Sequence, residues 1–236
     1  MTQSSLTQNE VNAGFDRRNV FDTLKSHDVM HHRAVYAELA NILMKFNGNF
    51  RMLDIGCGDC ADILPLLLKR CPDEYVGVDS ASEAIAQAAC NLAGATFPSH
   101  LTCGDYRQAL NERCPYDVIW MGLFLHHVPT KQKADFLQKA YGMLKQGGLL
   151  LAHDPLLQEK ETRSAFIDRL MKHGRSNWPF LAADDLQVAC RHWSEHGHQE
   201  SVSVLRELGL EANFSEVNLL WSDPDKFYGL LMFRRN

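Results

Sequence analysis

The sequence predicts an α/β fold: a doubly wound, seven-stranded and mostly parallel sheet with a C-terminal antiparallel hairpin and a small helical cap. Three observations support this. Short apolar runs typical of buried strands alternate with helical periodicity between residues 50 and 155. The first run leads into a glycine-rich turn at 56–58. Two extended segments joined by a proline- and aspartate-containing turn at 222–225 close the chain, which predicts a hairpin.

The hydrophobic periodicity of the N-terminal region predicts a helix from Phe15 to Phe46. Leu39, Ile42 and Leu43 recur at spacings of three and four, which places them on one face. The polar and glycine residues at 47–49 are expected to end this helix.

The alternating region follows. Strands are expected at 51–55, 75–78, 101–103, 118–121 and 149–152, with helices at 63–68, 80–92 and 130–144. Pro65 falls in the first turn of its helix, where a missing N–H costs little. Ser80 and Glu83 form a candidate capping box.

The order of the expected strands and helices predicts four segments. They are an N-terminal helical segment at 1–48, a cofactor-binding Rossmann-like core at 49–155, a helical cap at 156–198, and a return to the core with the hairpin at 199–236. The cap aromatics suit either an apolar acceptor or plain packing between helices.

The composition limits the classes of partner and substrate that the chain is expected to bind. The 236 residues are 45% apolar and carry a formal charge of -5, with no basic stripe of the kind that nucleic-acid binding needs. No apolar stretch is long enough to span a bilayer. The 7 cysteines are an odd number in core-like segments, which favours a reducing cytoplasm. A small-molecule substrate is therefore expected, and the oligomeric state is left open.

Acidic residues around the glycine turn decide between ligands. Gly56 and Gly58 allow close backbone approach, which suits a dinucleotide as well as other nucleosides. Asp54, at the end of the preceding strand, would repel a pyrophosphate and attract an ammonium or sulfonium. Asp79 ends the second strand, where an acid can accept ribose hydroxyls. Asp105 follows the third strand and can accept from an adenine amino group, with the Tyr106 ring beside it.

Six motifs in order resemble the class I S-adenosylmethionine-dependent methyltransferases, in particular their small-molecule branch. They are Leu53–Gly58, Val76–Asp79, Gly104–Asp105, Tyr116–Ile119, Leu125–Pro129 and Leu144–Gly148. The resemblance implies S-adenosylmethionine as cofactor, with its methionine part near Asp54, Gly56, Cys57 and Gly58 and its ribose near Asp79 and Ser80. It also implies adenine near Asp105 and Tyr106, and the sulfonium near Met121, Gly122 and Leu123.

Three histidines are candidate catalytic bases. His126 and His127 follow the fourth strand, and His153 ends the fifth, where α/β sheets bind ligands. Asp154 is placed to fix the imidazole of His153. A structural role for His126 or His127, capping or packing under the next helix, remains the alternative.

No metal site is expected. Cys57 and Cys60 form one pair at zinc-like spacing and His196 and His198 another, but a structural site needs a suitably spaced set. Other readings stay open: a protein that binds the same cofactor for different chemistry, such as modification of S-adenosylmethionine itself, a non-catalytic partner subunit, or an NAD-dependent dehydrogenase.

Overall fold

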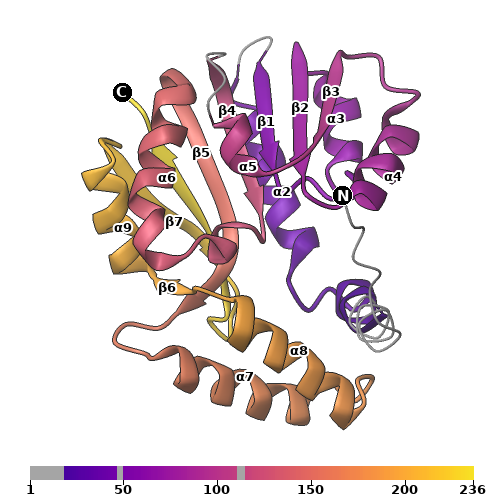
Figure 1. The fold of residues 1–236 in the computed structure, drawn as a ribbon, viewed down its shortest axis with the longest axis vertical. Helices are drawn as coiled ribbons and strands as arrows, with labels where there is room; N and C mark the ends of the chain where they lie inside the picture. Colours follow the sequence, from indigo (N-terminus) through magenta and orange to yellow (C-terminus); the bar gives the residue numbers. More distant parts are fainter. Residues whose placement is uncertain (1–18, 47–49, 111–114) are drawn as a thin grey trace, which may run out of the picture. The chain divides into compact units, whose positions relative to one another are not determined.

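A computed structural model of the chain describes residues 19–46, 50–110 and 115–236 (Figure 1). The expected start of the first helix at Phe15 and its expected stop at 47–49 lie outside these ranges. Two compact units are present. The larger unit comprises 33–160 with 198–236, and the smaller comprises 161–197 with the described part of 1–32.

A single sheet forms the centre of the larger unit. Its path runs β3-β2-β1-β4-β5-β8-β7, and a two-residue strand, β6, pairs with β5. The strands are β1 (Arg51–Ile55), β2 (Glu74–Asp79), β3 (Ser99–Cys103), β4 (Tyr116–Gly122), β5 (Leu144–Leu157), β6 (Glu200–Ser201), β7 (Glu216–Ser222) and β8 (Tyr228–Arg234). The first five strands of the path are parallel, while β8 runs antiparallel to both β5 and β7. The predicted parallel sheet and closing hairpin are confirmed.

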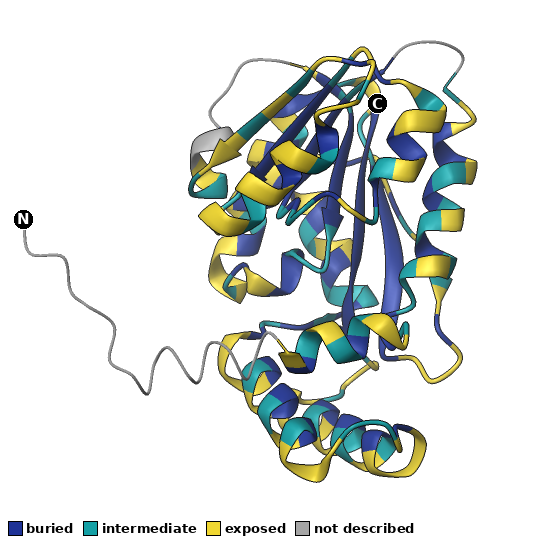
Figure 2. Cartoon of the chain, turned by 90° about the vertical axis from the view of Figure 1, so that its right-hand side faces the viewer, coloured by how far each residue is buried: buried dark blue, intermediate teal, exposed yellow. Residues whose placement is uncertain are grey.

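Helices cover both faces of this sheet. Alternate side chains of each strand point to opposite faces, so Leu53 and Ile119 pack into one core and Met52 and Trp120 into the other. The first core is closed by α6 (Thr130–Met143) and α9 (Val202–Glu211), together with the short α5 (Tyr106–Ala109). The second is closed by α2 (His32–Leu43), α3 (Leu64–Arg70) and α4 (Ser82–Leu92). Figure 2 shows the central strands buried and the outer helix faces exposed.

Two features predicted from short sequence patterns are confirmed. Pro65 does lie in the first turn of α3. In the closing turn, the buried Asp223 carboxylate accepts from the backbone N–H groups of Asp225, Phe227 and Tyr228, which fixes the hairpin. These features depend on residues close in sequence, so the pattern was enough to predict them.

Two local predictions were wrong. The N-terminal helix is not continuous: residues 19–26 are helical, and Asp28 and His31, both at positive φ (54° and 57°), turn the chain before α2 begins. The capping box is also absent. The N-cap of α4 is Ala81, which makes no side-chain cap bond. Its N–H donates instead to Asp79 Oδ1 at 2.8 Å, so Asp79 organises the loop that Ser80 was expected to cap.

The smaller unit contains α7 (Arg163–Asn177) and α8 (Ala183–His196). Thr162 caps α7 by accepting from the Ala165 N–H at 3.2 Å. The cap aromatics Phe166, Trp178 and Trp193 are buried, which is the packing role that the sequence left as an alternative. No helix within 19–46, 50–110 or 115–236 is both long and apolar enough to cross a bilayer.

Candidate active site

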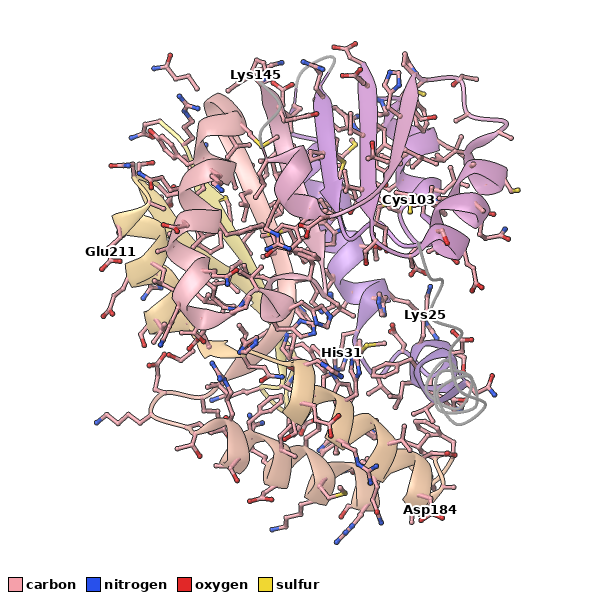
Figure 3. The ribbon with its side chains drawn as sticks, in the orientation of Figure 1. Lys25, His31, Cys103, Lys145, Asp184 and Glu211 are labelled. Atoms are coloured by element: carbon pink, nitrogen blue, oxygen red, sulfur yellow. The ribbon has the colours of Figure 1, made fainter. Side chains whose placement is uncertain are left out.

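A cavity of about 620 Å³ lies beside the strand ends of the larger unit. Its lining comes from the end of β2 and from the segments that follow the neighbouring strands β1 to β4, and consists of Gly56, Val78, Asp79, Ser80, Gly104, Asp105, Tyr106, Leu123, Phe124 and His127. Cys103, labelled in Figure 3, marks the end of β3 directly before this lining. The strand order reverses between β1 and β4, which is where open α/β sheets bind ligands.

The glycine turn forms one wall of the cavity. Gly56 and Gly58 both have positive φ, 78° and 55°. The N–H groups of Gly56 and Cys57 donate to Val78 O at 2.8 and 3.1 Å. A Cβ on Gly56 would lie 2.7 Å from Phe124 Cδ2, whereas one on Gly58 would meet nothing within 4 Å. Gly56 is therefore required by both conformation and space, and Gly58 by conformation alone.

Asp79 joins the glycine turn to β2. Its Oδ2 accepts from the Gly58 N–H at 2.9 Å and its Oδ1 from the Ala81 N–H at 2.8 Å. Each oxygen of an ionised carboxylate has a second lone pair. The Asp79 carboxylate, half-buried in the cavity wall, therefore keeps acceptor capacity for ligand hydroxyls.

Asp105 and an aromatic group form another part of the cavity wall. Arg107 Nε donates to both oxygens of Asp105, at 2.8 and 2.9 Å, and its guanidinium adds a further ion-pair contact. These hydrogen bonds lower the pKa of Asp105 to about 2. Tyr106 packs edge-on against Phe124 and Phe136, with ring centroids 5.0 and 5.6 Å away.

Asp54 is buried beneath the glycine turn and does not line the cavity. Tyr75 Oη donates to its Oδ2 at 2.7 Å, and Cys60 Sγ lies 3.2 Å from the same hydroxyl. Burial raises the pKa of Asp54 to about 7; the Tyr75 hydrogen bond opposes this rise, and the nearby Asp79 charge adds to it. Burial also raises the pKa of Tyr75.

The remaining residues predicted for the cofactor divide into two groups. Ser80, Tyr106 and Leu123 line the cavity. Cys57 and Met121 are buried, and the Met121 side chain belongs to the core beneath α6. Gly58 and Gly122 are half-buried, and neither is part of the lining. Burial raises the pKa of Cys57, as does its hydrogen bond to Cys60, which is the larger cause.

The three histidines occupy different environments. His127 is exposed and lines the cavity, while His126 and His153 are buried. His126 Nδ1 lies 2.8 Å from Asp154 Oδ1, so the carboxylate pairs with His126 rather than with the neighbouring His153. The expected His153–Asp154 pairing was wrong because adjacent residues on a strand point to opposite faces of the sheet.

Backbone contacts fix the segment that carries these histidines. Leu123, at a positive φ of 56°, donates its N–H to His153 O at 2.7 Å and so ties the end of β4 to β5. The buried Lys133 donates to the carbonyl oxygens of Leu125 and Val128 at 3.0 and 2.5 Å. These two carbonyls bracket the short 3₁₀ helix η1 (Leu125–His127).

Sequence reasoning missed several of these residues. Val78, Phe124 and Lys133 were not singled out. Lys133 had a signal: it shares the apolar stripe of α6 with Phe136, Leu137, Ala140 and Met143, where a cation is unusual. Phe124 had none, since its place depends on contacts with Gly56 and Tyr106.

No metal centre accompanies the cavity: across the described ranges, no three His, Cys, Asp or Glu residues are arranged to hold an ion. The cavity does fit an adenosyl cofactor. Two carboxylates, Asp79 and Asp105, stand at separate positions along it, and the Gly56 backbone leaves space that a Cβ would close.

Comparison with known proteins agrees with this geometry. Residues 53–150 match the family described as a methyltransferase domain. The chain is 24% identical over 213 residues to a carboxy-S-adenosyl-L-methionine synthase of Campylobacter fetus, covering 86% of each chain.

Two solved structures share the fold. One is a magnesium protoporphyrin IX methyltransferase of Synechocystis with bound SAH, with a TM-score of 0.64, 16% identity and 94% coverage of each chain. The other is the plantazolicin methyltransferase, with a TM-score of 0.65 and 14% identity, covering 93% of this chain and 90% of that one. Residues 53–150 are therefore similar in sequence to a methyltransferase domain, and the chain has the fold of solved methyltransferases.

Proposed function

We propose that the protein transfers the methyl group of S-adenosylmethionine to a small-molecule acceptor. The observation that carries this proposal is the cavity of about 620 Å³ in which the Gly56 backbone, the Asp79 carboxylate and the Asp105 carboxylate follow one another. Its volume lies within the range of small-molecule and cofactor sites.

The ribose hydroxyls bind the free lone pairs of Asp79, beside Ser80, and the adenine lies at Asp105 against the Tyr106 ring. The methionine part lies along the glycine turn, where Gly56, Cys57 and Gly58 present backbone. Asp54 acts from beneath the turn rather than by direct contact, because it is buried behind it. Leu123 faces the sulfonium, while Met121 and Gly122 contribute through the backbone.

The cofactor supplies a methyl group that its positive sulfur already activates, so the chain's own contribution is mainly positioning for in-line attack. His127 is the base for an acceptor that must lose a proton, since it is the candidate histidine that lines the cavity. The buried His126–Asp154 pair holds the adjacent residue and positions it. His153 has a structural role next to Tyr228, whose ring lies 5.9 Å away.

A second candidate follows from the likeness to the carboxy-S-adenosyl-L-methionine synthase. Modification of the cofactor itself by carboxylation would place a new negative charge next to the sulfonium. The described lining residues favour methyl transfer, because His127 is the only one of them that can carry a positive charge to balance a carboxylate beside the sulfonium.

One experiment tests both candidates. The purified protein is incubated with S-adenosylmethionine carrying an isotopically labelled methyl group and a metabolite extract, and products are read by mass spectrometry. A labelled methyl group on an acceptor supports methyl transfer, whereas a carboxylated cofactor supports the second candidate. Neither product, together with no calorimetric response to S-adenosylmethionine or S-adenosylhomocysteine, contradicts both.

A further inference from the structure

Both oxygens of the Asp105 carboxylate already accept hydrogen bonds from Arg107. Its Oδ1 accepts from the Arg107 backbone N–H at 2.9 Å and from Arg107 Nε at 2.8 Å. Its Oδ2 accepts from Arg107 Nε at 2.9 Å and from the terminal guanidinium nitrogen. A carboxylate has about four lone-pair sites, two on each oxygen. Three N–H groups of Arg107 therefore cover these sites, with the single Nε hydrogen shared between Oδ1 and Oδ2.

The same carboxylate lines the cavity at the position proposed for adenine. The exocyclic amino group of adenine is a hydrogen-bond donor, as is the guanidinium. Both cannot use the same lone pairs, so a bound adenine must displace at least one contact of the Arg107 side chain.

We propose that Arg107 competes with the cofactor's adenine for Asp105 and thereby limits how tightly the adenosyl group is held. This rests on the proposed adenosyl site. Arg107 lowers the affinity of the site, and its effect is opposite to that of an ordinary binding residue: its removal strengthens binding.

The displaced guanidinium has an alternative position in solvent. The Arg107 side chain is 64% exposed, so it moves into water without a burial cost. Release of Asp105 therefore requires no rearrangement of the backbone of α5.

A lower affinity for the adenosyl group favours turnover by speeding product release. The demethylated product keeps the same adenosyl group as the cofactor, so tight binding of that group slows product release. Binding energy spent equally on all bound states does not raise the rate of the chemical step, and release limits turnover in many enzymes. Competition by Arg107 lowers the shared part of the affinity and so favours release.

The test measures binding of S-adenosylhomocysteine, whose neutral sulfur removes the direct effect of a changed protein charge on a sulfonium. Arg107→Met removes the guanidinium while keeping most of the side-chain length, and Arg107→Lys keeps the charge but not the two-pronged geometry. Lys139→Met is the matched control, since Lys139 is exposed on α6 and lies outside the cavity lining. Calorimetry gives Kd, and stopped-flow displacement gives the dissociation rate.

We expect Arg107→Met to lower Kd for S-adenosylhomocysteine by about two- to fivefold, the range set by an exposed ion pair, with a slower dissociation rate. Arg107→Lys should fall between Arg107→Met and the unaltered protein, and Lys139→Met should match the unaltered protein. The analogue with hypoxanthine in place of adenine lacks the amino group, so its Kd should change less.

Unchanged or weaker binding of S-adenosylhomocysteine by Arg107→Met overturns the proposal. An equal gain for the adenine and hypoxanthine ligands also overturns it, because the effect would not pass through the amino group. If the unaltered protein fails to bind S-adenosylhomocysteine at all, the adenosyl site itself is wrong, and this result is distinct from the others.

Discussion

Substitution of Gly56 by alanine tests whether the glycine turn is held by conformation, by space or by both. The added Cβ would lie 2.7 Å from Phe124 Cδ2 and 3.3 Å from its Cβ and Cγ, at a φ of 78°. A left-handed backbone costs an L-residue about 1–2 kcal/mol, and overpacking adds about 1–3 kcal/mol. Together these predict a loss of about 2–5 kcal/mol in the free energy of unfolding.

Gly58→Ala is the matched control. Its φ of 55° is also left-handed, but a Cβ there meets no atom within 4 Å. This variant should lose only the conformational part, about 1–2 kcal/mol. Urea denaturation monitored by circular dichroism gives both values, and the difference between them measures the contact with Phe124.

A double-mutant cycle with Phe124→Ala completes the test. Removing the ring removes the atoms that the new Cβ would meet, so Gly56→Ala should cost less in the Phe124→Ala background, by about 1–3 kcal/mol. Equal losses at Gly56 and Gly58, together with no coupling to Phe124, would refute the close approach as the reason for this glycine.

Three further predictions concern the acidic residues. Asp79→Ala should weaken binding of S-adenosylhomocysteine by about 1–3 kcal/mol by calorimetry, through lost charged hydrogen bonds to ribose, and unchanged affinity would remove the ribose assignment. The pKa of Asp54 is about 7 when folded, against 3.8 for the free group. The folded chain thus holds a proton that the unfolded chain releases, and Asp54 lowers stability progressively as pH rises from about 4 to about 7. Asp54→Asn should therefore gain stability relative to the unaltered protein by up to about 4 kcal/mol between pH 4 and pH 8 in urea denaturation, and parallel profiles would contradict this. Asp154→Asn should destabilise the fold by about 1–3 kcal/mol by weakening the buried pair with His126, and additive losses in a double-mutant cycle with His126→Ala would count against that pair.

The sequence predicted the features whose causes are local or periodic. The alternation of strands and helices, Pro65 in the first turn of α3 and the 222–225 turn all depend on neighbours a few residues away. The cavity lining also followed in part, because the ends of parallel strands meet at one edge of a sheet. Asp79, Asp105 and His127 therefore appeared together in the prediction and in the cavity.

The features it could not predict arise from contacts between distant segments. Asp154 is adjacent to His153 in sequence, yet it pairs with His126, 28 residues away. Ser80 and Glu83 have the spacing of a capping box, but the Ala81 N–H at the start of α4 donates to Asp79 instead. The Asp79 carboxylate is held in place for this by the Gly58 N–H, which donates to its other oxygen. Lys133 is a different case, because the carbonyls of Leu125 and Val128 that it binds are only eight and five residues away, and the buried cation in α6 was itself a signal.

The hydrogen bonds between the glycine turn and β2 determine when the glycine turn at 56–58 can form. The N–H groups of Gly56, Cys57 and Gly58 all end on Val78 or Asp79, about 20 residues later in the chain. The left-handed backbone at 56–58 is thus imposed by a strand that the motif itself does not contain. A peptide that stops before residue 74 carries the whole glycine motif but none of its acceptors. The glycine turn forms only as β1 and β2 pair. Grafting it into another protein therefore requires both strands together.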